Sequence, residues 1–272
     1  MRGLAIFLVI VLLIVGALYA AGTLTGNAWW EPRTWNKPTA GDVMTDTKAV
    51  DLQGASTARV ELQMGAGRVT LSGGASDLMD ATFTYNVTAW KPIVDYVLTG
   101  DEGRLLVRQP SGTYQAFSGS YRNDWDIRLS GTTPVDLDLK NGAGDMDMDL
   151  SDTMVRTLTV DSGASSTTVK ASPKAMTSLT VKAGVGSVNL DLTGDWKNSA
   201  DVQVNGGVGS IKLVVPQNVG VTINAQRGLG SIDASGFTRN GSTYRNAAWG
   251  TTAVTLNLDL NVGVGSVTIS QK

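Results

Sequence analysis

The chain has 272 residues, with 22 Lys and Arg against 24 Asp and Glu, and it contains neither cysteine nor histidine. Without cysteine there are no disulfides or thiolate nucleophiles, and without histidine the commonest general base and metal ligand is missing. A net charge of −2 offers no basic footprint for nucleic acid. We therefore expect no enzyme, no catalytic or metal site, no cofactor and no nucleic-acid partner.

The first 22 residues read as a membrane anchor. Arg2 precedes an uncharged run over Leu4–Ala21, which as a helix would span about 27 Å, close to the hydrocarbon core of a bilayer at about 30 Å. The positive charge before the run predicts the N-terminus inside and the rest of the chain outside. We expect one transmembrane helix in the cell membrane, holding an extracytoplasmic domain. The run ends in small residues that also suit a signal peptidase, so secretion after cleavage is the alternative.

Residues 23–56 are predicted to be a linker, because they contain Pro32 and Pro38 and lack alternation. Apolar and polar residues begin to alternate at Thr57, which predicts a first β region over residues 57–134. This region includes one Gly-Ala-Gly bend. It also includes a polar, glycine-rich stretch, residues 109–123, that interrupts the strands.

Residues 135–272 repeat one arrangement, in which two short alternating runs flank a Gly-x-Gly corner. From Gly142 the corners follow at steps of 21, 21, 23, 21 and 35 residues, a period typical of repeat architectures. The glycine corners, including the early one, pair Gly65 with Gly67, Gly142 with Gly144, Gly184 with Gly186, Gly207 with Gly209, Gly228 with Gly230 and Gly263 with Gly265, and a degenerate copy stands at Gly163 and Ser165.

Alternation on both sides of each corner indicates two strands per repeat, each with one buried face. Glycine suits the corner because it adopts positive φ, and because stacked corners about 4.8 Å apart leave little room for a Cβ. The sequence thus predicts an all-β fold, a β-solenoid or roll of stacked two-strand rungs. Inward residues such as Val188, Ile211 and Ile232 should align in files inside it.

The last repeat is enlarged, and Asn240-Gly241 within it signals a tight hairpin. The chain then returns to the rung pattern and ends at Gln271 and Lys272. A polar, lysine-bearing end is typical of an exposed edge strand, so we expect the final strand at the edge of the sheet.

Two patterns that resemble ligand sites are better explained by structure. The Gly-x-Gly pairs lack the third glycine and the following helix of a dinucleotide site. A cluster of acidic residues, Asp145, Asp147, Asp149 and Asp152, lacks the nine-residue period of calcium-binding rolls and reads as a solvated strand face.

Aromatic residues mark two stretches that could contact a partner or could instead cover an open end of a sheet. The six residues are Tyr114, Phe117 and Tyr121 in the first stretch, and Phe237, Tyr244 and Trp249 in the second. For the second stretch, covering the sheet is favoured, because its hairpin interrupts a rung.

From Val60 onward the chain resembles the toast-rack proteins, bacterial extracytoplasmic β domains whose proposed role is adhesion. It is also similar to the C-terminal domain of the Lia-type membrane proteins of the cell-wall antibiotic response. The matching stretches begin Met64-Gly-Ala-Gly-Arg-Val-Thr-Leu, Asn141-Gly-Ala-Gly, Gly207-Val-Gly-Ser-Ile-Lys-Leu and Val262-Gly-Val-Gly-Ser-Val. The resemblance brings no catalytic residues with it.

The resemblance leaves two functions open. The chain is either a membrane-tethered surface module with a protein or glycan partner, or an accessory domain in cell-envelope stress signalling. The Lia-type proteins carry several membrane helices, whereas this chain has a single hydrophobic run.

Overall fold

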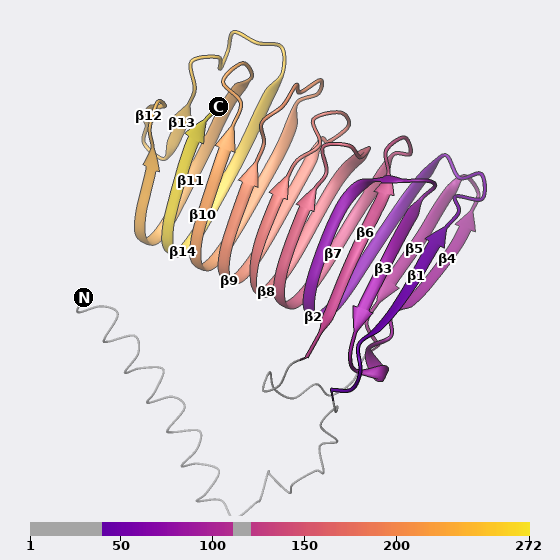
Figure 1. The fold of residues 1–272 in the computed structure, drawn as a ribbon. Helices are drawn as coiled ribbons and strands as arrows, with labels where there is room; N and C mark the ends of the chain where they lie inside the picture. The colour runs from indigo at the N-terminus through magenta and orange to yellow at the C-terminus, as the bar shows by residue number, and fades with distance from the viewer. Residues whose placement is uncertain (1–39, 111–120) are drawn as a thin grey trace, which may run out of the picture. The chain divides into compact units, whose positions relative to one another are not determined.

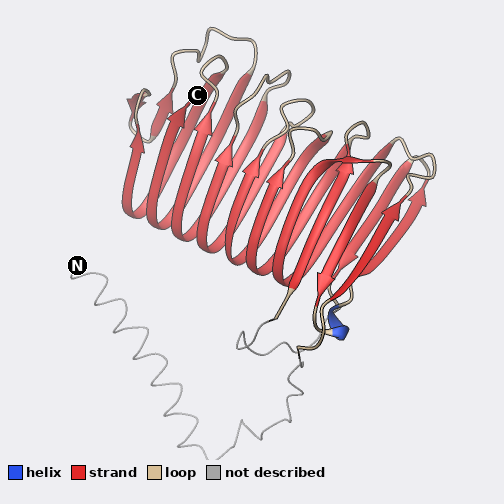
Figure 2. Ribbon diagram, in the orientation of Figure 1, coloured by secondary structure: helices blue, strands red, loops and turns tan. Residues whose placement is uncertain are grey.

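The computed structural model describes residues 40–110 and 121–272, and these residues form one 14-stranded sheet. Figure 2 shows the dominance of strands, with one short 3-10 helix, η1 (Thr88–Trp90). The all-β prediction is confirmed. None of the helices in the described ranges is long and apolar enough to cross a membrane. The predicted anchor, residues 1–22, lies outside these ranges.

The strands are β1 (Met44–Val50), β2 (Thr57–Ala75), β3 (Met79–Tyr85), β4 (Ile93–Thr99), β5 (Glu102–Arg108), β6 (Asn123–Ser130), β7 (Val135–Asp149), β8 (Val155–Lys170), β9 (Ser178–Asp191), β10 (Ala200–Val215), β11 (Gly220–Ala234), β12 (Thr238–Asn240), β13 (Thr243–Arg245) and β14 (Thr255–Gln271).

Each long strand is one rung that bends sharply at its corner, which is Gly-x-Gly in every long strand except β8, where it is Gly163-Ala-Ser165. Figure 1 shows these strands as a row of U shapes whose bends lie together along one edge. Every rung therefore has a first arm before the corner and a second arm after it. The rungs pair in parallel and in register through both arms, as Val181 with Val204 and Val188 with Ile211 in β9 and β10. The core lies between the two layers of arms.

Alternation along the arms places one file of side chains inside and the next outside. In β9 the inward residues Leu179, Val181, Val188 and Leu190 are at most 2% exposed. Outward positions carry polar residues such as Asn189, which is half-buried. Apolar burial of this kind contributes roughly 1.5–3 kcal/mol for each large aliphatic side chain. It is shared between rungs, because each rung covers the apolar row of its neighbour.

The corners stack backbone on backbone. At Gly186 and Gly209, the second glycines of two neighbouring corners, φ is +135° and +151°. A Cβ on Gly186 would lie 1.8 Å from the carbonyl oxygen of Ser165, and one on Gly209 would lie 1.6 Å from that of Gly186. Both the conformation and the close approach therefore require glycine.

The other four glycine corners share this backbone at their second position. There φ is +148°, +118°, +134° and +154°, at Gly67, Gly144, Gly230 and Gly265 respectively. In each of these four corners a Cβ would lie 2.1 Å or less from a neighbouring carbonyl oxygen, which for Gly67 is that of Asn123 in β6.

Within the corners, only the second position has positive φ. The prediction that glycine is needed for positive φ therefore holds for the second corner position and not for the first. The first glycines of the six corners have no positive φ, and at five of them the close approach of the next rung alone requires glycine. The exception is Gly65, where a Cβ would meet only the side chain of Gln109, at 3.2 Å. Ser165 stands at the second position in β8 without a positive φ, and its hydroxyl lies 3.1 Å from that of Thr167.

The order of the rungs departs from the order of the sequence at the C-terminal end. The final strand, β14, lies between β10 and β11 and pairs in parallel with both. The expectation that the chain ends on an exposed edge strand is therefore wrong, and Ile211 and Ile232 are separated by Val267. Burial explains the order. The inward residues of β14 include Leu256, Leu258, Leu260 and Ile269, where β11 has Val221, Ile223, Ala225 and Ala234, so β14 has more apolar surface to cover from two sides.

Antiparallel strands cap both ends of the parallel stack. At the N-terminal end β5 and β6 pair in parallel with the first and second arms of β2 and together take the place of one rung. Next to them lie β4 on one arm and β3 and β1 on the other. β1 comes from residues 23–56, the segment predicted to be a linker, so the sheet begins before Thr57. At the other end the β12–β13 hairpin covers the first arm of β11.

Candidate functional site: a groove along the corners

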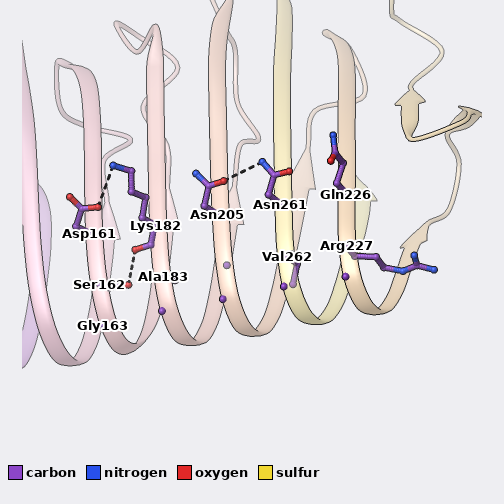
Figure 3. Close-up of a pocket in the computed structure, with 15 residues that line it drawn as sticks. Asp161, Ser162, Gly163, Lys182, Ala183, Asn205, Gln226, Arg227, Asn261 and Val262 are labelled. Carbon is purple, nitrogen blue, oxygen red and sulfur yellow. Dashed lines mark hydrogen bonds and ion pairs between the residues drawn. The ribbon is translucent and has the colours of Figure 1, made fainter. Parts of the chain in front are cut away.

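A shallow groove of about 840 Å³ crosses five consecutive rungs just before their corners. Figure 3 shows the side chains along it, one set from each of β8, β9, β10, β14 and β11. With strands about 4.8 Å apart, five rungs give a track about 19 Å long. The lining residues are Asp161, Ser162, Gly163, Lys182, Ala183, Gly184, Asn205, Gly206, Gly207, Gln226, Arg227, Gly228, Asn261, Val262 and Gly263.

The groove is hollow because its floor consists of the first glycines of the corners. A Cβ on Gly207 would lie 2.3 Å from the carbonyl oxygen of Gly184, and one on Gly263 would lie 2.6 Å from that of Gly207. No larger residue fits this stacking, so the floor stays free of side chains. The residue two positions before each floor glycine points outward and forms one wall.

Three rungs in a row carry a carboxamide on that wall, in the spatial order Asn205, Asn261, Gln226. Asn261 donates from Nδ2 to Oδ1 of Asn205 at 3.2 Å (Figure 3). Among the described residues, the Asn261 oxygen and the Asn205 amino group have no hydrogen-bond partner, so both can bind a ligand. Gln226 forms no hydrogen bond with any residue of the described ranges. A carboxamide both donates and accepts, so the wall presents both kinds of polar atom.

The charges beside the groove are largely compensated. In β9, Lys182 lies 3.7 Å from Asp161 of β8. Arg227 at the far end is exposed and forms no ion pair with any residue that the structure describes. The centre of the track is therefore uncharged.

The groove continues toward the N-terminal end as a section of about 480 Å³ that shares Asp161 with the larger one. Lys140 lines it and donates from Nζ to Oε1 of Glu61 at 2.7 Å. This bond, together with one from Gln63, holds the pKa of Glu61 below its usual value despite partial burial. The same bond raises the pKa of Lys140. This section too is lined by paired charges.

Aliphatic side chains follow the floor on its other side. The middle residue of each corner points outward, and at the C-terminal end of the stack it is large. Val185, Val208, Val264 and Leu229 are 55%, 45%, 41% and 69% exposed and stand in register on neighbouring rungs. We call these four residues the aliphatic row. An exposed apolar row beside a polar wall makes the track amphipathic.

The structure describes four of the six aromatic residues predicted to contact a partner, and these four lie at opposite ends of the stack. Tyr114 and Phe117 lie outside the described residues. Tyr121 packs against Trp90 at the N-terminal cap, with ring centroids 5.5 Å apart. The described strands on either side are β5, which ends at Arg108 beside the first arm of β2, and β6, which begins at Asn123 beside its second arm.

The second aromatic stretch lies at the opposite end of the stack. Tyr244 is buried on β13 under the guanidinium of Arg239, and Phe237 is half-buried. Trp249 is 39% exposed, with Arg245 stacked 3.8 Å from its ring centroid. The hairpin that carries Tyr244 pairs with the edge of β11, so it covers the sheet.

Sequence reasoning did not identify the groove. The sequence does contain a pattern that indicates the groove. In three of the repeats, the residue two positions before the first corner glycine is a carboxamide, namely Asn205, Gln226 or Asn261. Only the spatial order of the rungs shows that these three residues are neighbours.

The fold and the groove place the chain in the class of all-β stacked-rung proteins with an open surface track. A family model described as the N-terminal domain of toast_rack, DUF2154, matches residues 39–178 and 173–214. The chain belongs to this family.

Several solved structures are similar to the chain. A proposed cell adhesion protein from Clostridium sporogenes is 30% identical, with a TM-score of 0.68, over 85% of this chain and 100% of that one. A proposed adhesin from Bacteroides fragilis is 12% identical with a TM-score of 0.38, over 87% of this chain and 99% of that one. A comparison with curated proteins finds no match.

Proposed function

We propose that this chain is a non-catalytic, adhesin-like interaction module, tethered to the outer side of the cell membrane by residues 1–22. The observation that carries the proposal is the groove, an open amphipathic track that runs across five rungs. A track of this kind suits a long partner rather than an enclosed small molecule. Membership of the toast-rack family and the likeness to a protein with a proposed role in cell adhesion support it.

The rigidity of the stack also supports the proposal. Each rung is bonded to its neighbours along both arms, and the backbones of neighbouring corners are in close contact. Side chains on the outer faces are therefore held at fixed spacings. A fixed array of this kind binds an extended partner with little loss of its own conformational freedom.

Attachment of cells tests the proposed role. Cells that lack the chain should attach less well to their natural surface, and the wild-type chain should restore attachment. A Gly186→Val chain, with its corner disrupted, should not restore it. Unchanged attachment without the chain would refute the adhesive role, and capture of a membrane kinase by crosslinking would favour the signalling role instead.

The location can be tested separately, because the chain has no cysteine. Asn189→Cys puts a single thiol on an outward face of β9. A membrane-impermeant maleimide should label it in intact cells, and the mass of the labelled chain should show whether residues 1–22 remain. Labelling only after lysis would exclude the extracytoplasmic location.

A further inference from the structure

We infer that the groove binds a neutral, extended polysaccharide that lies along the stack, across the strands. The inference rests on the proposed function and assigns its partner class. Hydroxyl groups of the sugar chain would bond to Asn205, Asn261 and Gln226. The glycine floor would lie beneath the rings, with the aliphatic row along their other side.

The direction of the groove argues against a peptide strand as the ligand. The groove crosses the rungs, which are already hydrogen-bonded to one another on both sides of each corner. A peptide lying there finds no free strand edge to extend, so it loses the main-chain bonds that usually recognise an extended peptide. Recognition has to come from side chains.

The spacing of the side chains favours a sugar polymer. Carboxamides recur once per rung, about every 4.8 Å, whereas an extended peptide advances about 3.3 Å per residue, so successive residues of a peptide do not meet successive rungs. One sugar ring with its glycosidic oxygen spans close to one strand spacing in an extended chain. Successive sugars can therefore meet equivalent groups on successive rungs.

The chemistry of the wall suits hydroxyl groups. Asn205 keeps a free amino group, Asn261 a free carbonyl oxygen and Gln226 both, so the wall can donate and accept. Hydroxyl groups likewise donate and accept. The aliphatic row offers apolar surface to the C–H groups of a sugar ring, in register with the carboxamides.

The charges that line the groove do not suit a polyanionic ligand. Lys182 is paired with Asp161, and Lys140 with Glu61. Arg227 is then the one cation lining the larger groove that has no acidic partner among the described residues. A nucleic acid or an acidic polysaccharide would need a row of free cations to replace its counterions, so a neutral chain is the better fit.

Affinity electrophoresis of the full-length chain in detergent tests the inference. The gels contain hydroxyethyl cellulose as an extended β-1,4-linked neutral glucan, soluble starch as a coiled neutral glucan, or polygalacturonate as a polyanion. We expect hydroxyethyl cellulose to retard the chain most strongly. The variant Asn205→Ala/Asn261→Ala/Gln226→Ala should bind it at least about tenfold more weakly. Asn189→Ala, which removes a carboxamide on the other arm, should bind like wild type.

The outcomes separate the inference from the proposed function. If the triple variant keeps its melting temperature and still binds hydroxyethyl cellulose like wild type, the groove is not the site. Retardation by starch or polygalacturonate in preference to the extended glucan also overturns the inference. So does binding to isolated envelopes without binding to hydroxyethyl cellulose, and in that case the surface role stands. Unchanged attachment of cells that lack the chain, together with no binding of the chain to envelopes, removes both.

Discussion

The side-chain oxygen of Gln109 accepts a hydrogen bond from the backbone nitrogen of Gly65 at 2.8 Å. The same oxygen accepts from Ala66 N at 3.3 Å and from Asn123 Nδ2 at 3.2 Å. In this rung β5 ends before the corner and β6 starts after it, so none of the described strands pairs with the corner of β2 on that side. One carboxamide thus replaces the missing backbone of a neighbouring rung.

Gln109→Ala should lower the free energy of unfolding by about 1–3 kcal/mol, because the backbone N–H groups of Gly65 and Ala66 and the amino group of Asn123 all lose the acceptor that they share. Hydrogen exchange at Gly65 and Ala66 should accelerate more than exchange in β10. Gln63→Ala removes a single part-buried hydrogen bond, to Glu61, and should lower the free energy of unfolding by only about 0.5 kcal/mol. Equal effects of the two substitutions would contradict the role assigned to Gln109.

The corner of β9 makes a sharper prediction. Gly186→Val forces a branched side chain into positive φ and onto the carbonyl oxygen of Ser165. Strain and crowding together should cost about 3 kcal/mol or more. Asn189→Lys, three residues later on the outward face, should change stability by less than about 0.5 kcal/mol. Thermal melting of both variants checks this, and similar melting temperatures would disprove the assigned faces.

Much of this fold was predictable because its rungs obey a local rule. Alternation in β9 and β10 fixes which side of each arm is buried, as at Val188 and Ile211, and the need for glycine fixes the corners. The order of the rungs was not predictable, because β10, β11 and β14 carry the same pattern and each could pair with either of the others. Only the step of 35 residues before Gly263 hinted at a detour.

The groove depends on that order. Asn205, Asn261 and Gln226 stand side by side because β14 separates β10 from β11. In sequence order the three carboxamides would still face outward, but Asn261 would lie at the end of the row and could not bond to Asn205. The residue types could be read from the sequence, whereas their adjacency is a tertiary property.

A buried amide in β7 predicts a stabilising substitution. Asn141 is 3% exposed, and neither atom of its carboxamide has a hydrogen-bond partner among the described residues. Asn141→Leu keeps the approximate size and removes the cost of burying unpaired polar atoms, about 1–3 kcal/mol. The melting temperature should rise by several degrees. Asn123→Leu should lower it instead, because Asn123 donates to Ala66 O at 2.8 Å and accepts from Trp125 Nε1 at 3.0 Å. A lower melting temperature for Asn141→Leu would refute the argument.

The hydrogen bond between Asp46 of β1 and Tyr85 of β3 should make the stability of the chain fall at alkaline pH. The hydroxyl of Tyr85 donates to Oδ2 of Asp46. Burial and this bond raise the pKa of Tyr85 to about 12, and the bond from Tyr85 lowers the pKa of Asp46. An unfolded tyrosine titrates near 10. The contribution of Tyr85 to stability is therefore complete below pH 10 and is lost as the pH rises from about 10 to 12.

Thermal melting between pH 9 and pH 12 checks this pH dependence. Tyr85→Phe should show a smaller fall in melting temperature over that range than wild type. The contribution of Asp46 is present above about pH 4 and lost as the pH falls through its lowered pKa, so Asp46→Asn should lessen the acid loss. Identical pH profiles for Tyr85→Phe and wild type would contradict the pairing.

The insertion of β14 predicts that the C-terminal strand holds the end of the stack together. A chain ending at Gly250 loses β14, whose inward residues Leu256, Leu258, Leu260, Val267 and Ile269 are all at most 2% exposed. Each such side chain contributes roughly 1.5–3 kcal/mol, and β11 loses its only partner on its second arm among the described strands. Hydrogen exchange should show protection lost throughout β11, while β7 and β8 keep theirs. In a stack built in sequence order, removing the last rung would leave β11 paired with β10, so β11 that stays as protected as β10 would refute the observed order.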